Sequence, residues 1–595
     1  MDPPVLSFYG TEPVPLPSRF GNVKRRLVKG REKALQASWT RLLKALRTEV
    51  DHILEHGSDL IPSIDFADIQ NADHVAPFKD SLKRHGIGVI RRVVPPAQAS
   101  AWVEETNKYL ETKHDFKPPA AQDPTCFDFF WTPAQVRSRA HPNVLQAQRF
   151  AMGLWDTNDD DNLATRFPIT YADRLRIESI VDGKLIVNGS AIPIAKTAED
   201  NLIAAAAATS SAQIAQVDNG SLERWEMDGY GRGGLYDAIF RGEWEDYNPW
   251  DPAGRISATT DLYNGAGACS MLRLFQGILA LTVVEPGMIR LLPSPKLSTV
   301  YFLLRPFFSP KKSAPDGSSA TKEQWDEYLA AENWELEEEQ STIIHGAVAG
   351  HAQRVTGAWH PHLQLDKSLV TPPTLQVGDY IVWHPDQAYQ FSNTNYREST
   401  LPTPPGTGAG SASAPSAESN STSMLVYSPA APLTQTNALF LARQRKAFLR
   451  GHPGPDFDST GTGLGSEAPH TGRLGEKEIR EVGGEEALQA MGLAPWNLGK
   501  SIVVPVRPKM PSPPTSSPSS SLERRDSDGK DSDAGDAASV ARTESPHPHH
   551  RSLTPTTHAE VEVLKMANTI LWPDRYEFYM PTRASSPVPP KETEK

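Results

Sequence analysis

Cysteine is scarce in this chain, since Cys126 and Cys269 are its two thiols in 595 residues. Two thiols cannot build a disulfide framework, and they cannot supply the three or four sulfurs of a thiolate zinc site. This scarcity favours a reducing compartment. Dense blocks of Lys or Arg are also missing, and the formal net charge is −12. The sequence therefore predicts no nucleic-acid partner.

Long hydrophobic runs are missing as well. No apolar run approaches the roughly 20 residues that a helix needs to cross a bilayer. Residues 1–20 lack the charged, apolar and cleavage-site regions of a signal peptide. We therefore expect a cytoplasmic protein without membrane insertion. The hydrophobic share is 38%, and 52 prolines exceed the usual share of about 5%, so part of the chain is expected to lie outside any packed core.

Composition divides the chain into segments. Proline, serine, glycine and charge dominate residues 501–558, which cannot bury enough apolar area to offset the entropy of ordering. We therefore predict a flexible N-terminus over residues 1–22, a single domain over 23–500, the disordered segment, and a short helix and tail over 559–595. Within the domain, two inserts are predicted, at about residues 178–215 and 401–422.

Apolar spacing predicts the elements of the domain. Residues 23–55 carry apolar side chains at helical spacing and predict one long amphipathic helix. A turn and strand are expected over residues 85–94, and a helix after Pro95 and Pro96. Many strands without regularly alternating helices indicate a mainly β protein, a sandwich or barrel with added helices. The downstream strands are predicted at residues 271–284, 288–292, 298–308, 380–383 and 424–427.

Several strings, spread over most of the chain outside its low-complexity segments, resemble the YbiU-like proteins of bacteria and fungi. That family has no known function and is itself similar to 2-oxoglutarate and iron(II)-dependent dioxygenases. The strings are SWTRLLKALRTEV (38–50), IPSIDFADI (61–69), RHGIGVIRRVVP (84–95), YADRLRI (171–177), DNGSLERWE (218–226), LFQG (274–277), YFLLRPFF (301–308), HPHLQL (360–365), GDYIVWHPD (378–386) and ARQRKAFLRGHPGPDF (442–457).

The resemblance implies a double-stranded β-helix, or jelly roll, that holds one Fe(II) and its cosubstrate 2-oxoglutarate. In such sites a His-x-Asp motif and a distant histidine bind the metal. Here the first histidine corresponds to Gln216, the acidic ligand to Asp218, and the distal histidine to Tyr389. His384 is the nearest replacement for a lost imidazole. Arg397 lies at about the right distance along the chain to bind the keto-acid.

Two functions follow from this correspondence. The first is an oxidoreductase that hydroxylates an aliphatic carbon of a small organic or fatty-acyl substrate, with secondary metabolism as one setting. The second is a pseudoenzyme whose jelly roll serves binding or regulation, because two of the three ligand positions have changed.

We also consider that residues 178–215 arise from a retained intron or a misplaced exon boundary, which sequencing of the transcript would test. His360 and His362, in HPHL, could bind a metal, but a structural role is favoured.

Overall fold

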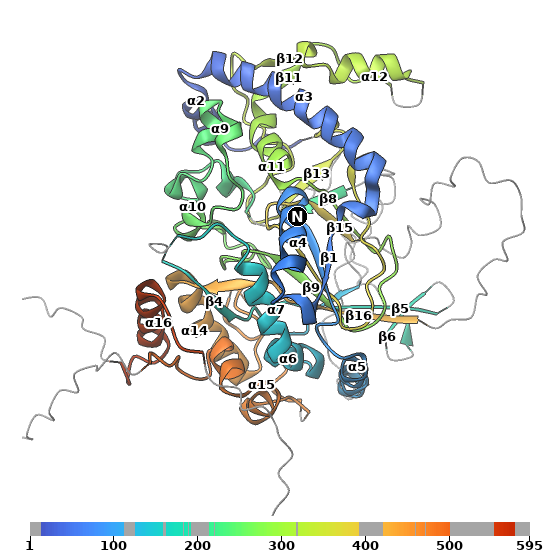
Figure 1. Ribbon diagram of the computed structural model, residues 1–595. Helices are drawn as coiled ribbons and strands as arrows, with labels where there is room; N and C mark the ends of the chain where they lie inside the picture. The colour runs from blue at the N-terminus through green and yellow to red at the C-terminus, as the bar shows by residue number, and fades with distance from the viewer. Residues whose placement is uncertain are drawn as a thin grey trace, which may run out of the picture.

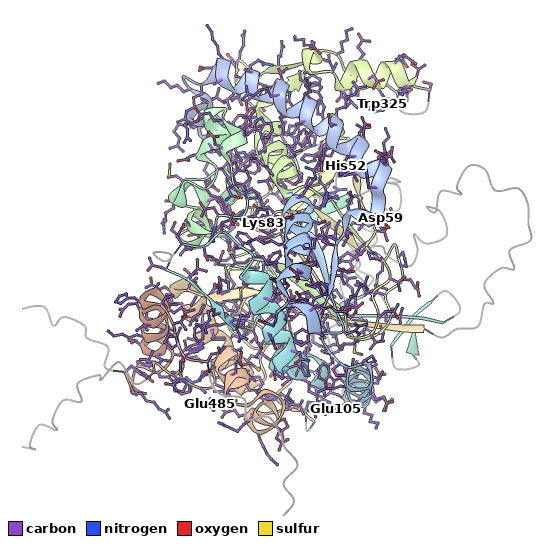
Figure 2. All side chains as sticks on the ribbon, viewed as in Figure 1. His52, Asp59, Lys83, Glu105, Trp325 and Glu485 are labelled. Carbon is purple, nitrogen blue, oxygen red and sulfur yellow. The ribbon has the colours of Figure 1, made fainter. Side chains whose placement is uncertain are left out.

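The computed structural model contains more helix than strand, with 44% helix and 14% strand (Figure 1). The prediction of sheets with added helices is confirmed at that level, but "mainly β" was wrong as a description of the whole. Side chains fill the spaces between the ribbons throughout (Figure 2). The structure describes residues 13–111, 125–158, 162–181, 184–187, 190–191, 214–218, 220–316, 319–391, 421–458, 460–470, 472–499 and 553–576.

A large sheet of nine strands forms the centre of the molecule. Its order begins at β1 and ends at β7, and β3 pairs with β5 at the side. Consecutive strands in this order often lie far apart in the sequence, so their pairing depends on long-range contacts. The strands are β1 (Ser63–Asp65), β2 (Ile87–Arg91), β14 (Tyr380–Trp383), β9 (Gln276–Ala280), β16 (Ser421–Tyr427), β5 (Leu175–Val181), β6 (Lys184–Val187), β7 (Ser190–Ala191) and β3 (Cys126–Phe127).

A smaller sheet of four strands accompanies it, in the order β10 (Ile289–Leu291), β15 (Tyr389–Phe391), β8 (Ile214–Val217), β13 (Gln353–Thr356). Two short antiparallel pairs complete the described strands. They are β11 (Phe308–Pro310) with β12 (Trp334–Leu336), and β4 (Ala164–Ile169) with β17 (Ala431–Leu433).

The two sheets share one apolar cluster, which we call the inter-sheet core. The large sheet contributes alternate residues to it, as the two-residue period of a strand requires. The small sheet contributes side chains from the face that it turns toward the large sheet. Members from the large sheet are Ile87, Val89, Ile278, Ile381 and Trp383, and members from the small sheet are Ile289, Leu291 and Tyr389.

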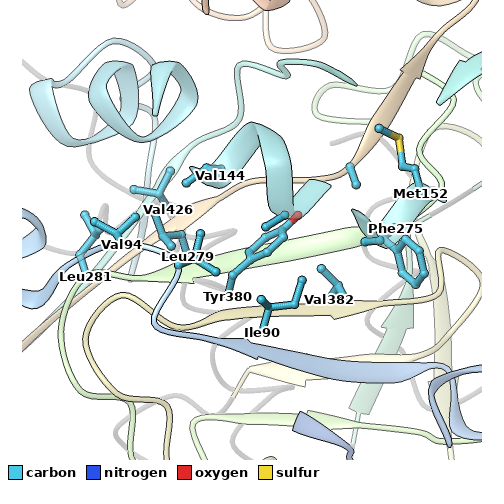
Figure 3. Close-up of a cluster of buried hydrophobic side chains, with 14 of the residues drawn as sticks. Ile90, Val94, Val144, Met152, Phe275, Leu279, Leu281, Tyr380, Val382 and Val426 are labelled. Atoms are coloured by element: carbon cyan, nitrogen blue, oxygen red, sulfur yellow. The ribbon is translucent and has the colours of Figure 1, made fainter. Parts of the chain in front are cut away.

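The opposite face of the large sheet packs against helices. Figure 3 shows Ile90, Leu279 and Tyr380 of the sheet in one apolar cluster with Val144 and Met152 of a helix. Tyr380 is fully buried, and its hydroxyl donates a hydrogen bond of 2.6 Å to the Ser428 carbonyl oxygen. The helices of this layer are α4 (Ala72–His85), α5 (Pro96–Glu111), α6 (Pro133–Ala140) and α7 (Pro142–Met152).

The outer face of the small sheet packs against a second helical layer. Leu35, Trp39 and Leu42 recur at helical spacing along α3 and are buried in the same cluster as Val217 and Val355. The helices on this side are α2 (Arg19–Val28), α3 (Glu32–His56), α9 (Asp237–Arg241), α10 (Ala253–Ile256), α11 (Pro295–Leu304), α12 (Lys322–Leu329) and α13 (Leu365–Ser368). Near the C-terminus follow α14 (Gln435–Arg450), α15 (Glu476–Ala490) and α16 (His558–Leu571).

Several predicted elements differ from the observed ones. The helix predicted over residues 23–55 is two helices, because the chain turns at Gly30, whose φ is +77°. The first of them, α2, begins at Arg19, inside the segment predicted to be flexible. The strand predicted over residues 298–308 is largely helix α11, because Pro295 opens a helical turn. Every side chain from Ser298 to Leu304 is buried. The sequence of this helix therefore lacks the recurring polar positions by which an amphipathic helix is recognised.

Other predicted elements are confirmed. The strand within residues 85–94 is β2, and the helix after Pro95 is α5. The predicted return of helix near residue 561 is α16. The predicted insert 178–215 contains strand residues at both ends, and residues 192–213 lie outside the described part, as do residues 401–420. No helix among the described residues is long and apolar enough to cross a membrane.

Candidate inter-sheet site

Strands β8 and β15 bring three predicted site residues together. They pair antiparallel, with Tyr389 directly opposite Gln216. Ala215 and Val217 of β8 are buried against the α3 layer, so strand alternation turns Gln216 toward the inter-sheet side, where Tyr389 lies. Asp218 follows at the end of β8. The sequence correspondence therefore selected positions that meet in space, although they are separated by more than 170 residues.

These three side chains hydrogen-bond to one another. The Gln216 amide Nε2 donates to Asp218 Oδ1 at 2.9 Å and to Tyr389 Oη at 3.0 Å. The Tyr389 hydroxyl donates to the other carboxylate oxygen of Asp218, Oδ2. Gln216 is exposed, Asp218 is half-buried and Tyr389 is buried. Each side chain of the triad therefore has hydrogen-bond partners within the triad without any added ligand.

The protonation of the triad follows from its surroundings. Burial raises the pKa of the Asp218 carboxyl, against the opposing effects of the Arg273 guanidinium and of the hydrogen bond from Tyr389. Burial, together with the neighbouring Asp218, raises the pKa of the Tyr389 phenol well above its ordinary value. Tyr389 therefore keeps its proton at neutral pH and acts as a donor toward Asp218.

This donor set does not fit Fe(II). A neutral phenol and a neutral amide stand where two imidazoles would be needed, and both are weak ligands for a ferrous ion. The Gln216 amide nitrogen and the Tyr389 proton also point at Asp218, which is the one good ligand. Within the described residues, no group of three or more His, Cys, Asp or Glu side chains is arranged to hold a metal ion.

Arg273 is a residue of this region that the sequence analysis missed. It is 4% exposed, and its Nε and Nη2 groups have no hydrogen-bond partner among the described residues. It lies in the irregular segment before β9, between Leu272 and Leu274, which are both buried in the cluster under the helical face of the large sheet. Burial lowers the pKa of its guanidinium, but Cys269 and Asp218 nearby outweigh that effect and the pKa is raised. One signal could have revealed it: a single charge in the apolar run 271–281.

A second buried arginine lies close to the same strands. The Arg176 guanidinium lies over the Phe391 ring, 3.8 Å from its centroid, and its Nε donates to the Tyr427 hydroxyl at 3.1 Å. Phe391 in turn contacts the Tyr389 ring edge-on, with centroids 5.7 Å apart. Arg176 is thus held by protein groups, unlike Arg273.

His384 is placed away from the triad contacts. Its Nε2 lies 2.9 Å from the Pro249 carbonyl oxygen, and its Nδ1 accepts from the Asp386 backbone N–H at 3.2 Å. The ring stacks on Trp155, with centroids 5.3 Å apart. Burial lowers the pKa of His384 to about 3. Both ring nitrogens are therefore engaged by the backbone, and the side chain serves packing and turn geometry.

A buried ion network joins the two chain segments that adjoin the triad. Asp386 is fully buried, with the Arg255 Nη2 at 2.6 Å and the Arg224 Nη1 at 3.4 Å. Arg224 lies in DNGSLERWE and Asp386 in GDYIVWHPD, so the network fixes the loop after β8 against the turn before β15. The two arginines hold the pKa of Asp386 far below its ordinary range, although burial opposes them.

Three other residues named from the sequence are His360, His362 and Arg397. His360 and His362 belong to the helical layer around α3, and burial lowers the pKa of each to about 3. The hydroxyl of Tyr301 lies 3.0 Å from His362 Nδ1, which agrees with the structural role favoured for the HPHL string. Arg397 lies outside the described residues, so its role stays a prediction.

Comparison with known proteins gives the family of this chain. YbiU of Escherichia coli K12, which has no characterised function, is 24% identical over 424 residues, 69% of this chain and 82% of YbiU. The crystal structure of GlcNAc Inducible Gene 2 from Candida albicans superposes with a TM-score of 0.62 at 24% identity, covering 82% of this chain and 92% of that one.

A protein of Salmonella typhimurium LT2, provisionally described as an oxidoreductase, superposes with a TM-score of 0.58 at 22% identity, covering 81% and 99%. At these identities the solved structures establish a shared fold. The Gig2-like family model matches residues 14–493, which is most of the chain. The chain therefore belongs to the Gig2-like family.

Proposed function

We propose that the chain is a jelly-roll protein that binds a small organic acid between its two sheets without iron. The order of its strands supports the jelly roll. Strand β8 lies in the small sheet, β9 in the large and β10 in the small. After the separate pair of β11 and β12, β13 lies in the small sheet, β14 in the large, β15 in the small and β16 in the large. Repeated passage between two facing sheets is typical of jelly rolls and cupins.

The single observation that carries the proposed ligand is Arg273. A buried cation without a full set of partners costs several kcal/mol relative to a paired one. Asp218 is close enough to affect its pKa, but in the described part of the chain neither Arg273 Nε nor Nη2 donates a hydrogen bond to it. A carboxylate from a ligand would satisfy the free N–H groups, because the planar guanidinium fork matches a carboxylate.

The triad would shape the other end of this site. Its hydrogen bonds hold Asp218 and Tyr389 in place without metal, which favours binding over redox chemistry. The ligand class is therefore an organic acid small enough to lie between two sheets. The proposal corresponds to the second function expected from the sequence, in which the jelly roll is kept for binding.

The oxygenase remains a second candidate function. Two observations favour it: Gln216, Asp218 and Tyr389 converge as the metal ligands of that class do, and one structural neighbour carries an oxidoreductase description. In this second proposal, Fe(II) and 2-oxoglutarate are the cofactors, and the reaction is hydroxylation of a small organic or fatty-acyl substrate. Because the donor set does not fit iron, no catalytic step is assigned here to any residue of the chain.

Calorimetric titration separates the two candidates. Purified protein is titrated with 2-oxoglutarate, succinate and acetate in the presence of EDTA, and then with 2-oxoglutarate and Fe(II) under anaerobic conditions. Binding of an acid in EDTA supports the first function, and Arg273→Gln should weaken it at least about tenfold. Arg47→Gln, an exposed arginine of α3, is the matched control and should bind like wild type.

Other results of the titration would contradict one or both candidate functions. If acid binds only with Fe(II), with a charge-transfer band and succinate formed in air, the oxygenase is correct. If no acid binds under either condition to folded protein, both candidates fail. Because Arg273 is buried, the melting temperature of each variant is measured, and a ligand that binds wild type should raise its melting temperature in proportion to occupancy.

A further inference from the structure

A separate cavity opens between α2, α9 and the loop that follows the triad. Its volume is about 310 Å³, within the range of small-ligand sites. None of Gln216, Asp218, Arg273 or Tyr389 lines it. The cavity is therefore distinct from the inter-sheet site, although Arg224, which belongs to the buried ion network, forms part of its floor.

Arginine supplies the charge of this cavity. Arg224 is paired with Asp386 and Arg241 with Glu243, so neither charge is free. Two guanidinium groups remain. Arg26 makes no hydrogen bond or ion pair within the described chain, and Arg31 makes one long contact, 3.4 Å to the Phe240 carbonyl oxygen.

One acidic group, Asp237, opposes these two cations at the rim. A phosphate monoester carries a charge of about −1.5 to −2 at neutral pH and offers three acceptor oxygens. Two arginine forks can bind it in bidentate fashion. The donors of the two guanidinium groups therefore match the three oxygens of a phosphoryl group better than the two oxygens of a monocarboxylate.

The remaining wall is apolar and aromatic. Trp225, Tyr230 and Phe240 line the cavity while being largely buried, so they present only edges and faces of their rings to it. Met227 stands at the same cavity with 70% of its surface exposed. A large exposed methionine beside an aromatic wall is typical of an adaptable apolar binding surface.

We propose that this cavity binds the phosphate monoester of a small, ring-containing molecule. Arg26 and Arg31 would hold the phosphoryl group, and the ring would lie against Trp225, Tyr230 and Met227. The size of the cavity limits the ligand to a single ring system with its phosphate. This inference does not depend on the function proposed for the inter-sheet site.

The test is calorimetry on the full chain with 1-naphthyl phosphate, inorganic phosphate and 1-naphthol as probes. Wild type should bind naphthyl phosphate at least about tenfold more tightly than either fragment, because both halves of the ligand contribute. Arg26→Gln and Arg31→Gln should each weaken naphthyl phosphate at least about tenfold, the loss expected for one charged hydrogen-bonding group.

The matched control is Arg25→Gln, on the same helix and exposed but outside this cavity. It should bind as wild type does. Equal losses in the Arg25 and Arg26 variants would overturn the site, since they would indicate attraction to the helix as a whole. Absence of naphthyl phosphate binding to folded wild type, or equal affinity for naphthyl phosphate and inorganic phosphate, would overturn the proposed ligand.

Discussion

At the scale of single residues, the central finding is a set of would-be metal ligands that satisfy one another. Gln216 donates to both partners and Tyr389 donates to Asp218. These hydrogen bonds hold the three side chains in their arrangement without iron.

Restoring both imidazoles should restore metal affinity. The variant Gln216→His with Tyr389→His recreates a His-x-Asp set with a distal histidine on adjacent strands. We expect it to bind Co(II) at least about tenfold more tightly than wild type, followed by the visible absorption of the cobalt site. Adding Asp218→Ala should abolish the gain. If the double variant is folded and binds no better than wild type, the three positions do not have metal-ligand geometry.

His384 also sets a pH dependence at this scale. Its folded pKa of about 3 lies below the ordinary 6.5, so between these values the unfolded chain binds a proton that the folded chain does not. Stability should therefore be fully present above pH 6.5 and should fall as the pH drops below it, by about 2 kcal/mol at pH 5 for this group. Urea unfolding of His384→Gln should show a shallower loss between pH 6.5 and 5 than wild type. Parallel curves would contradict this account.

At the scale of elements, the Asp386 network holds the site together. The loop after β8 and the turn before β15 adjoin strands that, among the described residues, pair at one position, Tyr389 opposite Gln216. Within the described residues, the link between these two segments is strengthened by Arg224 and Arg255 on the Asp386 carboxylate. Removing this carboxylate would leave two buried cations without their counter-charge.

Asp386→Asn should therefore destabilise the fold by about 3–5 kcal/mol, the cost of breaking a buried ion pair from one side. Urea unfolding measures the change. The control is Asp326→Asn, whose ion pair with Arg47 is exposed and should contribute less than about 1 kcal/mol. A similar, small effect in both variants would show that the network is not needed to fix the two segments.

At the scale of the whole molecule, local signals and long-range contacts were predictable to different degrees. Strand β2 and helices α5 and α16 were predicted, because glycine, proline or a capping residue stands at their ends. Helix α11 was missed because complete burial removed its polar face. Asp218 and Tyr389 came from the family resemblance. Arg273 was missed because its proximity to Asp218 is a long-range contact, which the single charge in the apolar run 271–281 does not by itself encode.

The C-terminal helix provides the last test of how the parts depend on one another. Helix α16 packs on α14 and on strand β4, and Leu564 is fully buried in that cluster. Leu564→Ala should lower the unfolding free energy by about 2–5 kcal/mol, because a cavity remains where the side chain was. If α16 is an integral part of the domain, tryptophan fluorescence and far-ultraviolet circular dichroism should shift together in urea. Lys565→Ala, half-exposed on the same helix, should leave both curves in place, whereas an unfolding step confined to the C-terminal cluster would show that α16 is only loosely coupled to the sheets.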